Sequence, residues 1–89
     1  MHRCHNINSA SRKGCYTCVE EFLKHGEDVN QVNITGISCL HQACFHNHPK
    51  IVKLLLEHGA DPYLTDIFGR RPLDVCHSKE VKNLLVSRT

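Results

Sequence analysis

The nine residues EFLKHGEDV at positions 21–29 return as LLLEHGADP at positions 54–62, which is 33 residues later. The following stretch, GISCLHQAC at 36–44, aligns at the same interval with GRRPLDVCH at 69–77. Self-similarity at a fixed period of this length is the sequence signature of stacked repeats, in which each unit buries its apolar face against its neighbours. The chain is therefore predicted to fold as about three copies of one small unit.

Each unit is predicted to contain two helices joined by a turn. Apolar residues recur at helical spacing, as in Ile51, Val52, Leu55 and Leu56. Glycines follow the apolar stretches, where a left-handed residue ends a helix, and prolines fall at first-turn positions. The expected helices are Ile7–Lys13, Tyr16–Lys24, Leu40–His46, Lys50–His58, Leu73–His77 and Lys79–Val86.

The third copy departs from the strict period. Aligning Val81 with Val52 requires the deletion of four residues, so the first helix of this copy, or the turn after it, must be short. Glu21 and Asn83 stand where the middle copy has Leu54. A stacked array needs polar outer faces at its ends, so we expect these two residues to be exposed.

The period and the residue pattern of the copies resemble the ankyrin repeat. The residues of the middle copy that match the family pattern are Asn33, Gly36, Ser38, Leu40, His41, Ala43, His48, Ile51, Val52, Leu54, Leu55, Leu56, Gly59, Ala60 and Asp61. The resemblance implies an all-α solenoid of stacked helix-turn-helix units with short β-hairpin loops. It implies one domain over 1–89, with a truncated repeat at about 3–32, a full repeat at 33–65 and a shortened capping repeat at 66–89.

The resemblance also implies a non-enzymatic module, of the scaffold or adaptor kind, that binds another protein or a peptide segment. In the family, the hairpin tips and the inner helices line a concave face. The positions of this chain that correspond to that face are Arg12, Lys13, Ile34, Thr35, Ile37, Phe45, His46, Ile67, Phe68 and Arg70. Many of them are apolar, and a contiguous exposed apolar patch marks a binding site.

Two other interpretations of these positions stay open. Ile34 and Ile67 could instead pack between neighbouring hairpins. Isolated apolar residues also occur on protein surfaces without any function. If the patch is a binding site, then Arg12, Lys13 and Arg70 would suit an apolar segment with acidic flanks.

A different class of function is an accessory or structural fragment whose ends stack on further repeats or on another domain.

A weaker alternative is a metal-binding module. Cys39, His41, Cys44, His46 and His48 are all zinc-ligand types within ten residues. The repeat register favours structural roles for them: a free thiol packs as a small apolar residue, and His41 matches a family histidine whose ring bonds to the neighbouring hairpin. We therefore predict no metal, cofactor or catalytic residue.

Two further motifs, at Cys15 and at Asn30, each have a simpler structural explanation. Cys15-Tyr16-Thr17-Cys18 is a CxxC, but redox motifs of this kind begin a helix after a strand, and here a helix and a glycine turn precede it. Asn30 lies in HGEDVN, which resembles ankyrin segments that undergo asparaginyl hydroxylation. The simpler interpretation is a hairpin asparagine that bonds to its own backbone.

Composition excludes several classes of protein. A net charge of +2 is too small to suggest nucleic-acid binding, and no apolar stretch is long enough to cross a membrane. The N-terminal residues lack the apolar centre of a signal peptide. We therefore expect the six cysteines to be free thiols in a reducing compartment, and the chain to be intracellular, cytoplasmic or nuclear, and monomeric.

Overall fold

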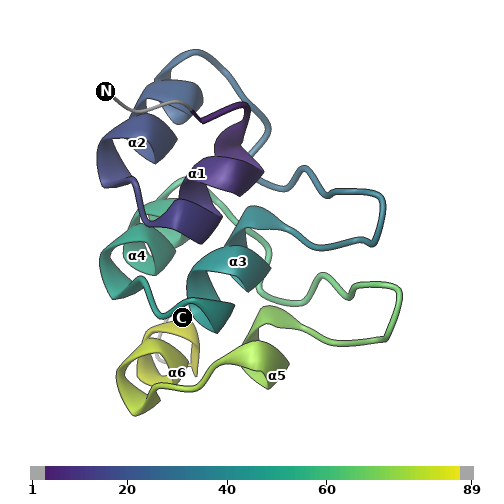
Figure 1. Ribbon diagram of the computed structural model, residues 1–89. Coiled ribbons are helices and arrows are strands. Elements are labelled where there is room, and N and C mark those ends of the chain that lie inside the picture. Colours follow the sequence, from purple (N-terminus) through teal and green to yellow (C-terminus); the bar gives the residue numbers. More distant parts are fainter. Residues whose placement is uncertain (1–3, 87–89) are drawn as a thin grey trace.

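The computed structural model describes residues 4–86 and arranges them as three successive helix pairs (Figure 1). The inner row consists of α1 (Ile7–Lys13), α3 (Cys39–Phe45) and α5 (Pro72–Val75). The outer row consists of α2 (Tyr16–Lys24), α4 (Pro49–Glu57) and α6 (Lys79–Val86). Helices contact their neighbours along each row, α1 with α3 and α2 with α4, so the all-α solenoid expected from the sequence is confirmed.

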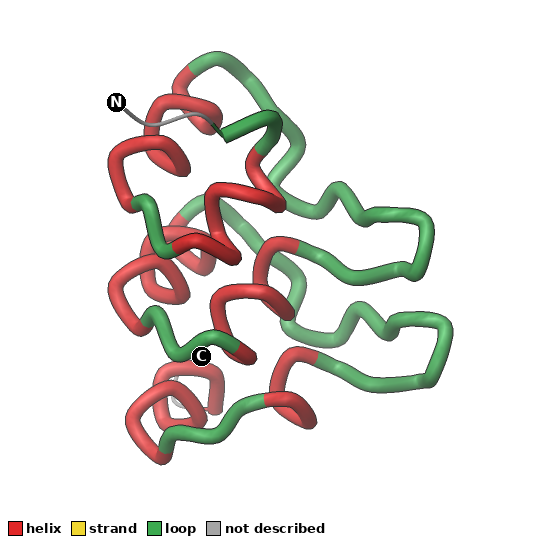
Figure 2. Tube along the Cα trace, viewed as in Figure 1, coloured by secondary structure: helices red, strands yellow, loops and turns green. Residues whose placement is uncertain are grey.

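The loops that join the pairs project from one side of the stack (Figure 2). The first of them has a single antiparallel bridge, between Val32 and Ser38, and within residues 4–86 no run of bridges long enough to be called a strand occurs. The amide of Ile67 donates to the oxygen of Thr35 at 3.0 Å. Neighbouring hairpins are therefore joined through their backbones.

Helix boundaries follow the capping residues. Ser38 accepts a hydrogen bond from the amide of His41, so α3 begins at Cys39, one residue earlier than expected, and ends at Phe45. Pro49 occupies the first turn of α4, which likewise runs from Pro49 to Glu57 and not from Lys50 to His58. The ranges predicted for α1, α2 and α6 are confirmed.

Helix α5 has four residues, two fewer at its end than the predicted range 73–77. Cys76 has extended backbone angles (φ −70°, ψ 139°) and stops the helix. The expectation of a short first helix in the third copy is therefore confirmed, and Cys76 lies just outside the helix, not within it.

The repeated glycines have the same backbone conformation in each copy. Gly26 and Gly59 have φ of 86° and 87°, and Gly36 and Gly69 both have φ of 76°. Matching torsions at equivalent positions show that the copies repeat in three dimensions. Asn47, which replaces glycine in the turn between α3 and α4, also takes a left-handed angle (φ 58°), as expected for asparagine.

A continuous apolar core runs between the two helix rows. It includes Cys39, Ala43 and Cys44 of α3 and Val52 and Leu55 of α4, none of which is measurably exposed. Leu54 is also buried, whereas Glu21 and Asn83 at the equivalent positions of α2 and α6 are exposed. These two polar residues therefore have the exposure that we expected of capping positions.

Candidate functional site

The loop of each repeat is fixed to the inner helix of the repeat before it. His41 of α3 lies with Nε2 2.7 Å from the backbone oxygen of Arg70. Asn8 of α1 makes the equivalent bond, from its amide nitrogen to the oxygen of Ile37 at 2.9 Å. The role expected for the His41 ring is confirmed, and these bonds hold the hairpins beside the inner helices.

A pocket of about 210 Å³ opens between α3, α5 and the last hairpin. Its lining residues are Ile37, His41, Gln42, Phe45, His46, Asp66, Arg70 and Val75. Ile37, Phe45, His46 and Arg70 of this lining were predicted from the sequence as partner-binding positions. The structure therefore brings four predicted residues together around one concavity.

The remaining predicted apolar residues lie on the hairpin tips. Ile34 is 99% exposed, Ile67 65% and Phe68 69%, and Phe45 at the end of α3 is 50% exposed. The interpretation that Ile34 and Ile67 pack between hairpins is wrong, because both residues are largely exposed; the hairpins contact each other through the amide of Ile67 and the oxygen of Thr35. Their side chains are left available on the surface.

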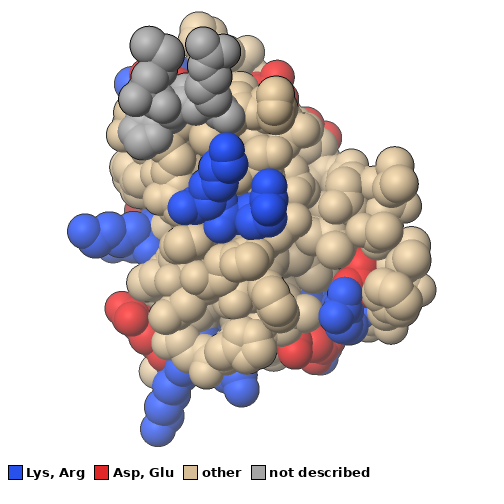
Figure 3. Space-filling model, viewed as in Figure 1, with Lys and Arg blue, Asp and Glu red and all other residues tan. Residues whose placement is uncertain are grey.

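Basic residues flank this surface unevenly. Arg12 and Lys13 form the exposed last turn of α1, and Figure 3, which looks onto the inner helices, shows Lys and Arg side chains gathered over α1. Burial, followed by the positive charges of His48 and Arg12, lowers the pKa of His46. Arg12 therefore lies close enough to affect the pocket residue His46.

Arg70 is held within its own hairpin. Its Nε donates to Asp66 Oδ2 at 2.8 Å, and its guanidinium carbon lies 5.0 Å from the centre of the Phe68 ring. Burial alone would raise the pKa of Asp66, but hydrogen bonds from Arg70 and Phe68 more than offset it and lower the pKa. The charge of Arg70 is thus partly neutralised, and Arg70 also orients Phe68.

Four residues of the pocket lining were missed as site residues, namely His41, Gln42, Asp66 and Val75. His41 was predicted to bond to the neighbouring hairpin, not to line a binding site. Gln42 donates to Asn8 Oδ1 at 2.9 Å and so joins α3 to α1. Gln42 directly follows His41 in the sequence, and this neighbourhood was the one signal that could have placed Gln42 near the hairpin.

The candidate ligands at 39–48 do not converge on one point in the described part of the chain. Cys39 and Cys44 are buried in the core, and His41 is bonded to Ser38 and to Arg70. Burial raises the pKa of Cys39 to about 12, and burial also raises the pKa of Cys44. These thiols are therefore protonated packing groups at neutral pH.

Asn30 bonds to the next repeat. Its Oδ1 accepts from the amide of Asp61 at 2.8 Å, and its own amide donates to Asp28 Oδ1 at 2.9 Å. The expectation that its side chain bonds to its own backbone is therefore wrong, because Asn30 links two successive loops.

The CxxC begins α2 directly after the turn at Gly14. Cys15 is the N-cap residue, and its sulfur accepts from the amide of Cys18 at 3.3 Å. The expected setting, after a helix and a glycine turn, is confirmed.

Comparison with known proteins agrees with this architecture. The family model for ankyrin repeats in three copies matches residues 7–88. The chain belongs to the ankyrin-repeat family. Ankyrin repeats are in general protein–protein interaction modules.

Several ankyrin proteins are similar to this chain. The ankyrin repeat protein YahD of Escherichia coli K12 is 39% identical over 91% of this chain and 45% of its own length. Ankyrin repeat domain-containing protein 40 of Homo sapiens is 31% identical over 89% of this chain and 22% of its own. The crystal structure of the ankyrin domain of Bcl-3 superposes with a TM-score of 0.87 at 30% identity, over 90% of this chain and 35% of that one. The chain thus spans less than half the length of each relative.

The helices of this chain do not have the properties of membrane-spanning segments in the part that the structure describes. Among residues 4–86, none combines the length and the hydropathy that a bilayer span requires.

Proposed function

We propose that this ankyrin chain is a non-enzymatic module that binds a partner protein through the pocket and the hairpin tips. The observation that carries the proposal is that Ile34, Ile67 and Phe68 are exposed on hairpins whose other residues, together with Phe45, line a pocket. Exposed aromatic and aliphatic residues around a concavity are typical of binding anchors. Such residues would be a liability if they contacted only water.

The polar groups of the pocket support binding more than catalysis. Both ring nitrogens of His41 have partners, at Ser38 and Arg70. The carboxylate of Asp66 accepts from Phe68 and Arg70. These two titratable groups hold the loop in place, so they are not positioned as a free acid–base pair for chemistry on a ligand.

The charges suggest the kind of partner. Arg12 and Lys13 lie at the α1 end of the face, while Arg70 at the other end already has Asp66 as its counter-ion. We infer a partner segment with an apolar anchor for the pocket and acidic residues on the side that faces α1. Electrostatic complementarity of this kind sets orientation and association rate.

Selection of binding peptides from a random display library, followed by measurement of Kd, tests the proposal. Phe45→Ala and Phe68→Ala are each expected to weaken binding at least about tenfold, which is roughly 1.4 kcal/mol. Val86→Ala on α6 is the matched control, since it removes another exposed apolar side chain. A folded Phe45→Ala/Phe68→Ala variant that binds the selected peptides like the wild type would refute this binding face.

A further inference from the structure

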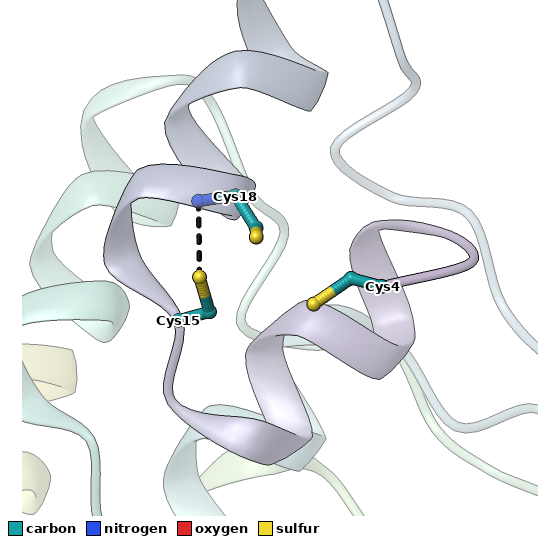
Figure 4. Close-up of side chains that lie close together, drawn as sticks. All are labelled: Cys4, Cys15 and Cys18. Atoms are coloured by element: carbon teal, nitrogen blue, oxygen red, sulfur yellow. Dashed lines mark hydrogen bonds between the residues drawn. The ribbon is translucent and has the colours of Figure 1, made fainter. Parts of the chain in front are cut away.

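Three cysteine side chains converge away from the pocket, beside the start of α2. The Sγ atoms of Cys4, Cys15 and Cys18 lie within 4.8 Å of one another, and all three residues are free and partly buried. Figure 4 shows them coming from the segment before α1, from the N-cap of α2 and from its first turn. Neither the packing of the pocket nor the proposed binding face uses these thiols.

The ankyrin fold does not require sulfur at these positions. The residues 33 positions further on are Ile37, His48 and Ile51. Ile51 is buried in the core, and His48 is the N-cap residue of α4, whose side chain makes no capping hydrogen bond and lies 3.1 Å from the oxygen of Arg12 through Nε2. The second copy thus builds the same turn and helix start with no thiol, so the fold alone does not account for three sulfurs meeting in the first copy.

We propose that Cys4, Cys15 and Cys18 form a three-thiolate site for a thiophilic d¹⁰ metal ion, Zn²⁺ or Cu(I). Soft thiolate ligands select these ions over hard cations. A zinc–sulfur bond is about 2.3 Å long, so sulfurs around one tetrahedral ion lie about 3.8 Å apart. The three sulfurs need to approach by no more than about 1 Å, which small side-chain rotations can supply.

The surroundings of Cys15 suit a thiolate ligand, whereas in the metal-free protein the neighbouring Cys15, burial and Cys4 raise the pKa of Cys18 to about 12, so an ion has to displace the Cys18 proton. Cys15 Sγ already accepts the amide hydrogen of Cys18, at 3.3 Å, and such outer bonds orient metal ligands and stabilise their charge. The partial positive charge at the beginning of α2 acts in the same direction. The three ligands come from two sides of the α1–α2 turn, so an ion would tie the segment before α1 to α2.

Loading the site replaces the thiol protons with the ion. Three S–H groups release three protons to the buffer, and three metal–sulfur bonds form without any change of oxidation state. A Zn²⁺ complex would keep a fourth position for water, whereas Cu(I) would be satisfied by three sulfurs. Either ion would bind native protein more tightly than unfolded chain and so would raise Tm.

Titration of the reduced 89-residue protein with Zn²⁺ and, separately, with Cu(I), each against a chromophoric chelator and without oxygen, tests the site. We expect one equivalent of at least one ion to bind and to raise Tm. Cys4→Ile and Cys18→Ile place the residue of the second copy at each position, so the fold is expected to survive while affinity falls at least tenfold. Cys76→Ala, which removes a thiol elsewhere, is expected to leave affinity unchanged.

Binding of neither ion to the wild type would overturn the proposal. Equal affinity in the wild type, Cys4→Ile and Cys18→Ile would do the same, as would an equal loss in Cys76→Ala. Charge-transfer absorption on addition of Co²⁺, present in the wild type and absent in Cys18→Ile, would independently establish sulfur ligation. These measurements involve no partner, so their outcome is separate from that of the proposed binding face.

Discussion

The Nε2 atom of His41 lies 2.7 Å from the backbone oxygen of Arg70. Its other ring nitrogen accepts from the amide of Ser38, at 3.2 Å, so the proton that points to Arg70 is on Nε2. One side chain thereby caps its own helix and holds the hairpin of the next repeat. Asn8, 33 residues earlier, holds the preceding hairpin through Ile37.

Replacement of His41 by alanine is expected to lower the free energy of unfolding by about 2–3 kcal/mol, because it leaves the Ser38 amide and the Arg70 carbonyl without partners. His41→Asn is expected to recover part of this loss, since Asn8 makes the equivalent bond. Urea unfolding followed by circular dichroism measures both. An effect of His41→Ala below about 0.5 kcal/mol, the range of ordinary surface changes, would contradict this role.

Stability is expected to fall in acid partly through Asp66. Its pKa is lowered in the folded protein, despite burial, by hydrogen bonds from Arg70 and Phe68. The folded state therefore binds fewer protons than the unfolded chain, and the stabilisation is fully present above the ordinary carboxyl pKa of about 4 and is lost as the pH falls through the lowered value.

Asp66→Asn tests this directly, because Asn33 occupies the equivalent position and accepts from the amides of Thr35 and Ile37. The variant should keep the loop hydrogen bonds, and its free energy of unfolding should depend less on pH between pH 7 and 3. Asp74, whose pKa is lowered by Arg71, is expected to contribute a further dependence. An unchanged pH slope in Asp66→Asn would show that Asp66 does not contribute.

Gly36 and Gly69 form a matched pair for measuring the contact between hairpins. Both have φ of 76°, so alanine at either site should cost about 1 kcal/mol in backbone strain. A Cβ at Gly36 would also lie 3.0 Å from the Cα of Asp66, whereas a Cβ at Gly69 would meet nothing within 4 Å. Denaturant unfolding should therefore show Gly36→Ala to be the more destabilised variant by about 1 kcal/mol or more. An equal loss of unfolding free energy in the two variants would mean that the hairpins can move apart to accept the Cβ without a loss of stability.

Alkylation of the native, metal-free protein should distinguish two classes of thiol. Cys39 and Cys44 are fully buried, and burial raises the pKa of both, so iodoacetamide should modify them only after global unfolding. The partly exposed Cys4 and Cys15 should react first. Peptide mapping by mass spectrometry gives the order, and early modification of Cys39 would contradict the packing described.

Much of the fold could be predicted because it repeats. The 33-residue interval placed α1 and α2 correctly, and α6 was placed by its apolar spacing after a deletion of four residues, since apolar spacing and glycine position are local signals. The errors of one residue at α3 and α4 arose at Ser38, whose side chain caps α3, and at Pro49, which occupies the first turn of α4. At α5 the helix was predicted to continue to His77, but Cys76 has extended backbone angles and ends it earlier.

The candidate site was less predictable, for a physical reason. The family resemblance predicted which positions face the groove, but the exposure of Ile34 and the hydrogen bond between Ile67 and Thr35 depend on how the hairpins are placed in space. The approach of Cys4 to Cys18 likewise depends on how α1 crosses α2, which no local signal fixes. Apart from the contact of His41 with the next hairpin, which the family resemblance implied, contacts between elements could therefore not be predicted from the repeat period. The repeat limits and the partner-binding residues remain predictions.

The hairpin anchors bear on how such a chain could change length during evolution. Asn8 reaches Ile37 and His41 reaches Arg70, and each pair is separated by 29 residues. Duplication or excision of one whole unit would therefore leave every surviving anchor with a partner at its usual separation. Genetic recombination in steps of a full period could lengthen or shorten the array without any compensating mutation at the junction.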